Sequence, residues 1–79
     1  MTEDEIAQRL EAAAQLYDDA AAELERAVAH CRTAAGHFRS GEVPRGAAHG
    51  LAARGHLLEA EARLDEQARA HARRSNPQP

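Results

Sequence analysis

The chain has 79 residues and a formal net charge of −3, with 13 acidic and 10 basic side chains. A chain of this length holds one domain and has room for only a small hydrophobic core. Aromatic residues make up 3% of it and there is a single cysteine, which excludes a large aromatic core and an internal disulfide. We expect one all-α domain over residues 1–75 whose thin core gains stability from self-association.

The N-terminal half predicts a helix over about residues 3–39. Thr2 and Glu5 have the spacing of a capping box, and the acids that surround Glu5 suit a helix N-terminus. From there, apolar residues recur every seven positions. One row carries larger side chains and the other mostly small ones: Leu10, Tyr17, Leu24, Cys31 and Phe38 against Ile6, Ala13, Ala20, Ala27 and Ala34. This pattern favours tight antiparallel packing, with Cys31 as an inert buried thiol.

Residues 40–45 predict a turn, with Gly41 placed like the residue after a helix end and Pro44 like the first residue of a new helix. A second helix is expected over about 46–74, since five apolar residues and one histidine recur there at spacings of three and four: Ala53, Leu57, Ala60, Leu64, Ala68 and His71. Residues 76–79 predict a disordered tail. A hairpin centred near Val43 would pair residues whose numbers add to 86, which places Glu23 opposite Arg63.

An alternative divides the second half at Gly55 and gives three helices. The series Gly55-x-Leu57-x-x-Ala60-x-x-x-Leu64-x-x-Ala68 resembles the second half of a tetratricopeptide repeat, a helix-turn-helix unit that binds partner peptides. The large aromatic residues of that family's first helix are missing here. If the helix is continuous instead, Gly55 costs about 1 kcal/mol and indicates close approach of Cys31 or of another chain.

Four of the five histidines lie between residues 30 and 56, and their positions are regular. His30 and His56 form one pair whose numbers add to 86, and His37 and His49 form the other, so the hairpin makes two rungs. Each rung offers two imidazoles to Zn, Cu, Ni or Fe, with Cys31, Glu42 or Glu59 as possible further ligands. A rise of about 10.5 Å over seven residues prevents all four from sharing one ion, so a complete site needs a second copy.

Two other interpretations of these histidines stay open. The rings can flank the seam, cover apolar surface and keep their polar edges in water without binding any ligand. They can also form a pH-responsive interface, because neighbouring imidazoles resist accumulating positive charge.

Charge is segregated along the chain, with −7 over residues 1–25, +4 over 26–54 and 0 over 55–79. The positive block makes the turn end electropositive. Apolar and basic residues combine there, and we expect a protein partner to bind at Phe38, Arg39, Val43 and Arg45. A solvated charged surface is the alternative. Nucleic acid is not expected, because the chain is acidic overall and no aromatic residues alternate with the arginines.

The sequence shows no nucleophile triad, phosphate-binding glycine loop or zinc-finger cysteine spacing, so we expect a non-enzymatic interaction or accessory protein. The hairpin is expected to dimerise into a four-helix bundle through Leu10, Tyr17, Leu24, Cys31, Leu57 and Leu64. A metal-binding protein that uses interface histidines is the alternative. Apolar stretches are too short to span a membrane and no secretory leader is recognisable, so a cytoplasmic location is expected.

The size and hairpin architecture also resemble the small helical proteins exported by actinobacterial type VII secretion. That resemblance implies a secreted hairpin protein. The turn Ser40-Gly41-Glu42 departs from the family pattern, because it lacks the tryptophan of the family's Trp-x-Gly motif.

Overall fold

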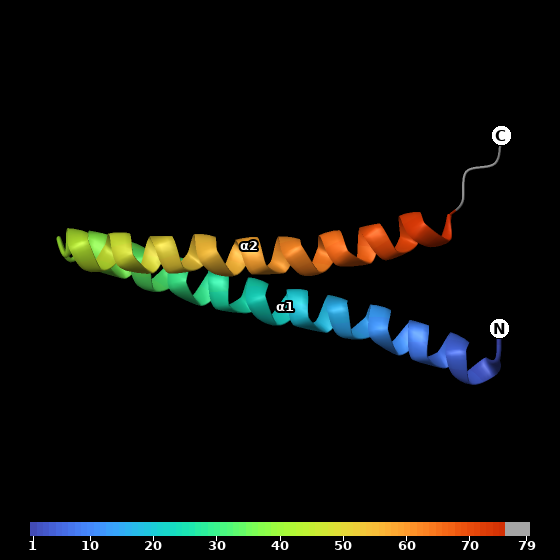
Figure 1. The fold of residues 1–79 in the computed structure, drawn as a ribbon. Helices are drawn as coiled ribbons and strands as arrows, with labels where there is room; N and C mark the ends of the chain where they lie inside the picture. Colours follow the sequence, from blue (N-terminus) through green and yellow to red (C-terminus); the bar gives the residue numbers. More distant parts are fainter. Residues whose placement is uncertain (76–79) are drawn as a thin grey trace.

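A computed structural model describes residues 1–75 of the chain as two long antiparallel helices. Helix α1 spans Glu3–Arg39 and helix α2 spans Val43–Arg74. The start of α1 and the end of α2 lie together at the open end of the hairpin, away from the turn (Figure 1). The expected helical hairpin is confirmed. Helix α2 runs through Gly55 without a break, so the three-helix alternative is wrong. The predicted disordered tail, residues 76–79, lies outside the described residues.

The N-terminus of α1 is capped as its sequence predicts. The hydroxyl Oγ1 of Thr2 accepts a hydrogen bond from the backbone N–H of Glu5 at 3.1 Å. All three residues of the first turn, Glu3, Asp4 and Glu5, are acidic and so complement the positive end of the helix dipole. The local sequence therefore fixes where α1 begins.

The chain reverses at Gly41, whose φ of 73° lies in the left-handed region that favours glycine. The N–H of Glu42 donates to the carbonyl of His37 at 2.8 Å, and the N–H of Gly41 donates to the carbonyl of Phe38 at 3.0 Å. These two bonds form a Schellman motif that closes α1. Helix α2 then begins at Val43, earlier than residue 46, because Pro44 fits a first helical turn where no N–H is required.

The two helices meet along a seam of mostly small side chains. Positions with reduced exposure recur in both helices at spacings of three and four, as knobs-into-holes packing requires. The seam consists of Ala13, Leu16, Ala20, Glu23, Ala27, His30, Ala34 and His37 in α1, and Gly46, His49, Ala53, His56, Ala60, Arg63, Gln67 and Ala70 in α2. Within residues 1–75, the buried apolar side chains are Ala20, Ala34, Ala53 and Ala60.

Gly46 allows the aromatic ring of Phe38 in α1 to lie against the backbone of α2 at the turn end. A Cβ atom at this position would lie 2.6 Å from the ring of Phe38, which is closer than two carbon atoms can approach. Phe38 therefore packs from α1 over the backbone of α2 while about half of its surface stays exposed. This contact depends on glycine at position 46.

The larger apolar row of α1 lies outside the seam, contrary to expectation. Four of its members follow a seam alanine by four residues and Leu10 follows Ile6, which places the row on the flank of the hairpin. All five are exposed: Leu10, Tyr17, Leu24, Cys31 and Phe38. The hairpin places the alanines of the small row in the seam because alanine lets the helix axes approach, whereas Ile6, also expected at the core, is 45% exposed. The predicted burial of the Cys31 thiol is therefore wrong. Close approach of Cys31 to Gly55 is also wrong, because a Cβ at Gly55 would meet nothing within 4 Å.

Toward the chain ends the helices diverge (Figure 1). The facing positions there carry long polar side chains, and a hollow of about 290 Å³ lies between the helices, lined by Met1, Ile6, Arg9, Leu10, Ala13, Gln67 and Arg74. Neither of the two described helices contains a segment apolar enough to cross a membrane.

Candidate functional site

The seam brings four histidines together in the middle of the hairpin. His30 and His37 lie seven residues apart on α1, and His49 and His56 lie seven apart on α2, so each pair projects from one face of its helix. All four are partly buried; the side chains of His37 and His56, for example, are 24% and 30% exposed. The surrounding alanines leave the space that the imidazole rings fill.

Both histidine pairs expected from the sequence are in ring contact. His30 stacks on His56 with their ring centroids 5.3 Å apart, and His37 stacks on His49 at the same distance. A further contact joins the two stacks, because Nδ1 of His30 and Nδ1 of His49 lie 3.0 Å apart, within hydrogen-bond distance. The spacing of the histidines did not predict this bond.

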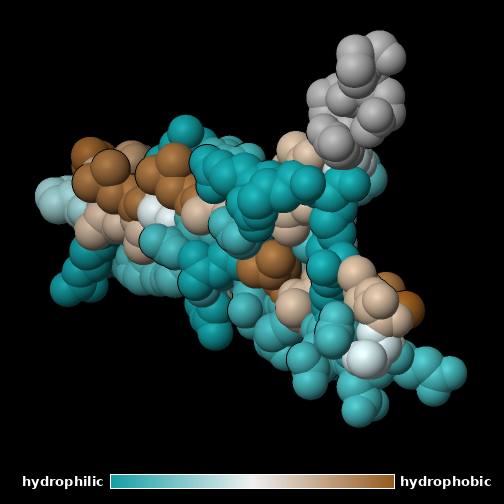
Figure 2. Space-filling model, turned by 45° about the vertical axis from the view of Figure 1, so that its right-hand side comes forward, coloured by the Kyte–Doolittle hydropathy of each residue, from teal (hydrophilic) through white to brown (hydrophobic). Residues whose placement is uncertain are grey.

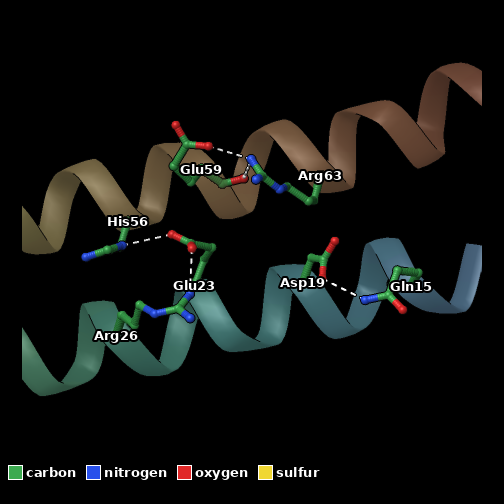
Figure 3. Close-up of polar contacts among 7 residues, drawn as sticks. All are labelled: Gln15, Asp19, Glu23, Arg26, His56, Glu59 and Arg63. Carbon is green, nitrogen blue, oxygen red and sulfur yellow. Dashed lines mark hydrogen bonds and ion pairs between the residues drawn. The ribbon is translucent and has the colours of Figure 1, made fainter.

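A carboxylate closes each end of the histidine series. Nδ1 of His37 donates to Oε2 of Glu42 at 2.7 Å, and Nδ1 of His56 donates to Oε2 of Glu23 at 2.8 Å (Figure 3). Hydrogen bonds and ring stacks thus alternate, and each contact crosses from one helix to the other or to the cap of α2. We call this series the histidine ladder; its members, in order, are Glu42, His37, His49, His30, His56 and Glu23.

The ladder defines the register of the two helices. Its hydrogen-bonded pairs have numbers that add to 79, whereas its stacked pairs have numbers that add to 86. Each side chain therefore lies between two residues of the facing helix, as a knob lies in a hole. Glu23 consequently bonds to His56, while Arg63, its expected partner, pairs with Glu59 on its own helix (Figure 3).

Arginines partly neutralise both terminal carboxylates of the ladder. Nη1 of Arg26 lies 2.6 Å from Oε1 of Glu23, and Nη1 of Arg45 lies 3.4 Å from Oε2 of Glu42. The hydrogen bond from His56 is the main cause that lowers the pKa of Glu23 below its ordinary value, with further contributions from Arg26 and Arg63; burial opposes the shift. Glu23 therefore favours the ionised form.

One chain offers an incomplete set of ligands for a metal ion. Among residues 1–75, no three histidine, cysteine, aspartate or glutamate side chains converge as an ion would require. His30 and His49 bring two nitrogens close together, whereas Nδ1 of His37 and of His56 already donates to a carboxylate. Of the further ligands expected, Glu42 is a ladder member, Glu59 pairs with Arg63, and Cys31 is exposed on the flank.

A second feature is an apolar flank beside the seam. In an antiparallel pair, the flanking positions four residues after one row of the seam lie on the same side in both helices, and here most of them carry large apolar groups. The apolar flank consists of Leu10, Tyr17, Leu24, Cys31 and Phe38 of α1 with Val43, Leu57 and Leu64 of α2. It contains all six residues expected to form an oligomer seam.

Most side chains of the apolar flank are exposed, for example 40% for Leu24 and 67% for Leu10, whereas Leu57 is half-buried. Counted along α1, the flank extends over about 42 Å from Leu10 to Phe38. Figure 2 shows hydrophobic atoms reaching the surface at the turn end, in the middle and near the N-terminus of one view of the molecule. The flank on the other side of the seam is mostly polar, with Asp19, Arg26, Thr33, Glu59 and Glu66 at the equivalent positions.

The four residues expected to contact a partner lie together at the turn end. Phe38 and Arg39 end α1, Val43 begins α2, and Arg45 follows within its first turn. Phe38 and Val43 are about half exposed, and the guanidinium of Arg45 pairs with Glu42. The tip thus combines apolar surface with positive charge.

Comparison with known proteins identifies no relative: the chain matches no protein-family model, and neither a curated protein nor a solved structure matches it significantly. Any function must therefore be argued from the ladder, the apolar flank and the tip.

Proposed function

We propose that this chain is a non-enzymatic helical interaction protein that pairs with a second copy of itself through the apolar flank. Exposure of the flank carries the proposal. The described hairpin buries only alanines as its apolar core, while Tyr17, Leu24 and Phe38 stay in water. Burial of such side chains contributes about 1.5–3 kcal/mol each, so pairing of two flanks would supply stability that the hairpin lacks.

The surface area of the chain supports this proposal. Its accessible surface is 5930 Å², whereas a compact protein of 8.5 kDa exposes about 4,700 Å². The excess exceeds the roughly 800 Å² that each partner contributes to a standard protein–protein interface. A four-helix bundle of two hairpins would remove this excess from water.

Charge favours one arrangement of the two copies. The turn end carries the +4 block and the first 25 residues carry −7. Two hairpins that pack with the turn of one against the open end of the other bring these blocks together around a two-fold axis. The tip residues Phe38, Arg39, Val43 and Arg45 remain our prediction for a contact with a different protein.

Sedimentation equilibrium of the untagged chain at micromolar concentration tests the proposal. We expect the wild-type chain to form a dimer, and we expect Leu24→Glu to weaken it at least tenfold, because a carboxylate would be buried at the centre of the flank. Raising the salt concentration should weaken the dimer further, since the charged blocks attract each other.

Leu51→Glu provides a matched control. Leu51 is 76% exposed on the outer face of α2, away from the apolar flank, and the substitution changes charge and size in the same way. Its dimer should be as stable as that of the wild type. A wild-type chain that stays monomeric, or equal weakening by the two substitutions, contradicts pairing through the flank.

The approach of His30 and His49 favours a second candidate function, the binding of a transition metal such as Zn, Cu, Ni or Fe. Their Nδ1 atoms are 3.0 Å apart, close to the roughly 3.3 Å that separates two imidazole nitrogens on one tetrahedral zinc ion. An ion there would replace the proton that the two rings share and would need ligands from another molecule. Native mass spectrometry before and after a chelator, on protein purified without a nickel column, tests this: metal in a fixed ratio supports it, and metal-free protein opposes it.

A further inference from the structure

We infer that the outer face of α2 is a second self-association surface, which pairs antiparallel with the same face of another copy about a two-fold axis. We call this face the outer seam; it consists of Leu51, Gly55, Leu58 and Ala62. The outer seam lies apart from the apolar flank, because Leu58 follows Leu57 of the flank by one residue and so projects about 100° away from it. The inference does not depend on the proposed pairing through the flank.

The outer seam is apolar and uncovered. Its residues recur at spacings of three and four, as those of the seam between α1 and α2 do. Among residues 1–75, α2 packs only against α1, which leaves the opposite face of α2 open (Figure 1). Leu51 is 76% exposed, more than any other large apolar side chain of the described residues, and Leu58 is 49% exposed. A helix face of this kind is suited to contact another helix.

Leucines and small residues alternate along the outer seam, and this alternation is complementary to a second copy. When Gly55 of one copy faces Leu58 of the other, the numbers of facing residues add to 113. Leu51 then faces Ala62 of the second copy, and the two-fold axis repeats both contacts. Each of these four layers joins one leucine to one small residue, as interdigitation of two closely packed helices requires.

This arrangement explains the glycine at position 55. Glycine destabilises a helix interior relative to alanine, and a Cβ at Gly55 would meet nothing within 4 Å in its own chain. Packing within the hairpin therefore gives no reason for a glycine here. Across the two-fold axis, the missing side chain leaves room for Leu58 of the second copy at the centre of the contact.

The charged residues beside the outer seam are complementary in the same alignment. On one side, Arg54 comes opposite Glu61 of the second copy, and on the other side Arg45 comes opposite Glu66. The two-fold axis repeats both pairs, so four pairs of opposite charge surround the apolar layers. Between residues 45 and 66, no two like charges face each other. Charge thus favours a second copy of this chain as the partner.

These charged side chains can exchange partners, because their contacts within the chain are long and exposed. Arg54 lies 3.9 Å from Glu61 of its own helix, and Arg45 lies 3.4 Å from Glu42. Glu66 lies at the same distance, 3.4 Å, from an arginine of its own helix. Exposed ion pairs of this kind contribute little to stability, so replacing them by pairs across the axis costs little.

The outer seam is short, so its pairing is weaker than that of the apolar flank. It extends over about 16 Å of helix, whereas the flank extends over about 42 Å. Small interfaces are typical of weak association, and we expect the outer seam to pair only as the concentration approaches millimolar. Dimers formed through the flank would then join into larger assemblies through their outer seams.

Sedimentation velocity of the untagged chain from micromolar to millimolar concentration tests the outer seam. The variant Leu24→Glu, altered on the flank, should be monomeric at micromolar concentration and dimeric near millimolar. Adding Leu58→Glu buries a carboxylate in the two central layers and should keep the chain monomeric throughout. A Leu24→Glu chain that stays monomeric near millimolar concentration, or dimers that persist equally after Leu58→Glu, overturn the inference.

Val28→Glu, added to Leu24→Glu in place of Leu58→Glu, is the matched control. Val28 lies on α1 and is 47% exposed, close to the 49% of Leu58, and the substitution introduces the same carboxylate. It should leave dimerisation unchanged, and circular dichroism checks that all the variants remain helical. Equal weakening by the two substitutions overturns the inference.

Gly55→Leu separates a fitted seam from general adhesion of apolar surface. In the Leu24→Glu chain, this substitution adds exposed apolar surface and a residue that favours a helix, so nonspecific association would increase. The outer seam instead needs a small residue opposite Leu58, and overfilling this layer should weaken dimerisation by about tenfold. Stronger or unchanged dimerisation overturns the inference.

Mixing two charge variants tests the pairing of Arg54 with Glu61 of the second copy. Arg54→Glu and Glu61→Arg, each made in the Leu24→Glu chain, should dimerise about fivefold more weakly than that chain, because like charges then meet at two places. In an equimolar mixture opposite charges meet again at both places, so dimerisation should recover. The ion pair within one chain cannot produce this recovery. A mixture that associates no better than the separate variants overturns the inference.

Discussion

The turn half and the open half of the hairpin differ in how the helices meet. Between residues 20 and 60 the seam contains every buried residue of the described chain and the whole histidine ladder. Outside this range the facing positions include Arg9, Arg63, Gln67 and Arg74 beside Ala13, Leu16 and Ala70, and the helices diverge around a hollow. Since both halves are regular helix, the side chains at the seam, rather than helix propensity, set the distance between the helices.

The largest effect on stability is expected from enlarging a buried alanine in the turn half, where the helices are closely packed. Ala60 is 0% exposed, so Ala60→Leu must push the helices apart. We expect the free energy of unfolding to fall by about 1–3 kcal/mol, as is usual when a packed seam is overfilled. Urea unfolding followed by circular dichroism measures this loss.

Ala13→Leu is the counterpart in the open half. Ala13 lines the hollow between the diverging helices, where a larger side chain finds space. The same change in volume should therefore leave stability unchanged or raise it by about 1 kcal/mol or less. Equal losses from the two substitutions would show that the halves do not differ in packing.

The turn itself gives the next largest effect. Gly41→Ala places a Cβ on a residue with φ of 73° and should cost about 1–2 kcal/mol. Gly55→Ala is the opposite case, because its Cβ would meet nothing within 4 Å and alanine favours a helix by about 1 kcal/mol. Thermal melts should therefore move in opposite directions for the two variants; a loss in both would indicate that Gly55 has a contact outside the hairpin.

The smallest effect is expected at the end of the ladder and only in acid. Because the pKa of Glu23 is lowered by the hydrogen bond from His56, the ionised carboxyl stabilises the fold above the ordinary glutamate range, and this contribution is lost as pH falls through and below that range. Between pH 5 and pH 3, Glu23→Gln should therefore lose less stability than the wild type. Glu25→Gln, with no ion pair in the described part of the chain, should lose as much as the wild type. Identical acid curves for the wild type and Glu23→Gln would contradict this role.

The fold could be predicted because its signals are local. Thr2, Gly41 and Pro44 mark where helices begin and end, and a seven-residue apolar repeat needs no knowledge of the partner helix. Which of the two apolar rows of α1 is buried against α2 could not be predicted from local signals. Leu24 and Ala20 are both apolar and lie one turn apart, and only the distance between two alanine-lined helices decides that Ala20 is buried and Leu24 exposed.

The site was predicted in part for the same reason. The spacing of the four histidines identified both stacked pairs, because equal spacings on two antiparallel helices must coincide. The bond between His30 and His49 and the pairing of Glu23 with His56 were not predicted. They form because each of these side chains lies between two residues of the facing helix and does not lie directly opposite one. Knobs-into-holes packing could have revealed them. If each seam side chain is placed between two facing residues that are seven apart, His30 contacts both His49 and His56.

The short connection of residues 40–42 has a consequence for how fast the hairpin forms. Closing so small a loop costs little chain entropy, and the first contacts beyond it join residues that are close in sequence. Folding is therefore expected to start at the Gly41 turn and proceed along the seam toward the chain ends, like a zipper. Substitutions near the turn should slow refolding, whereas those in the open half should mainly accelerate unfolding.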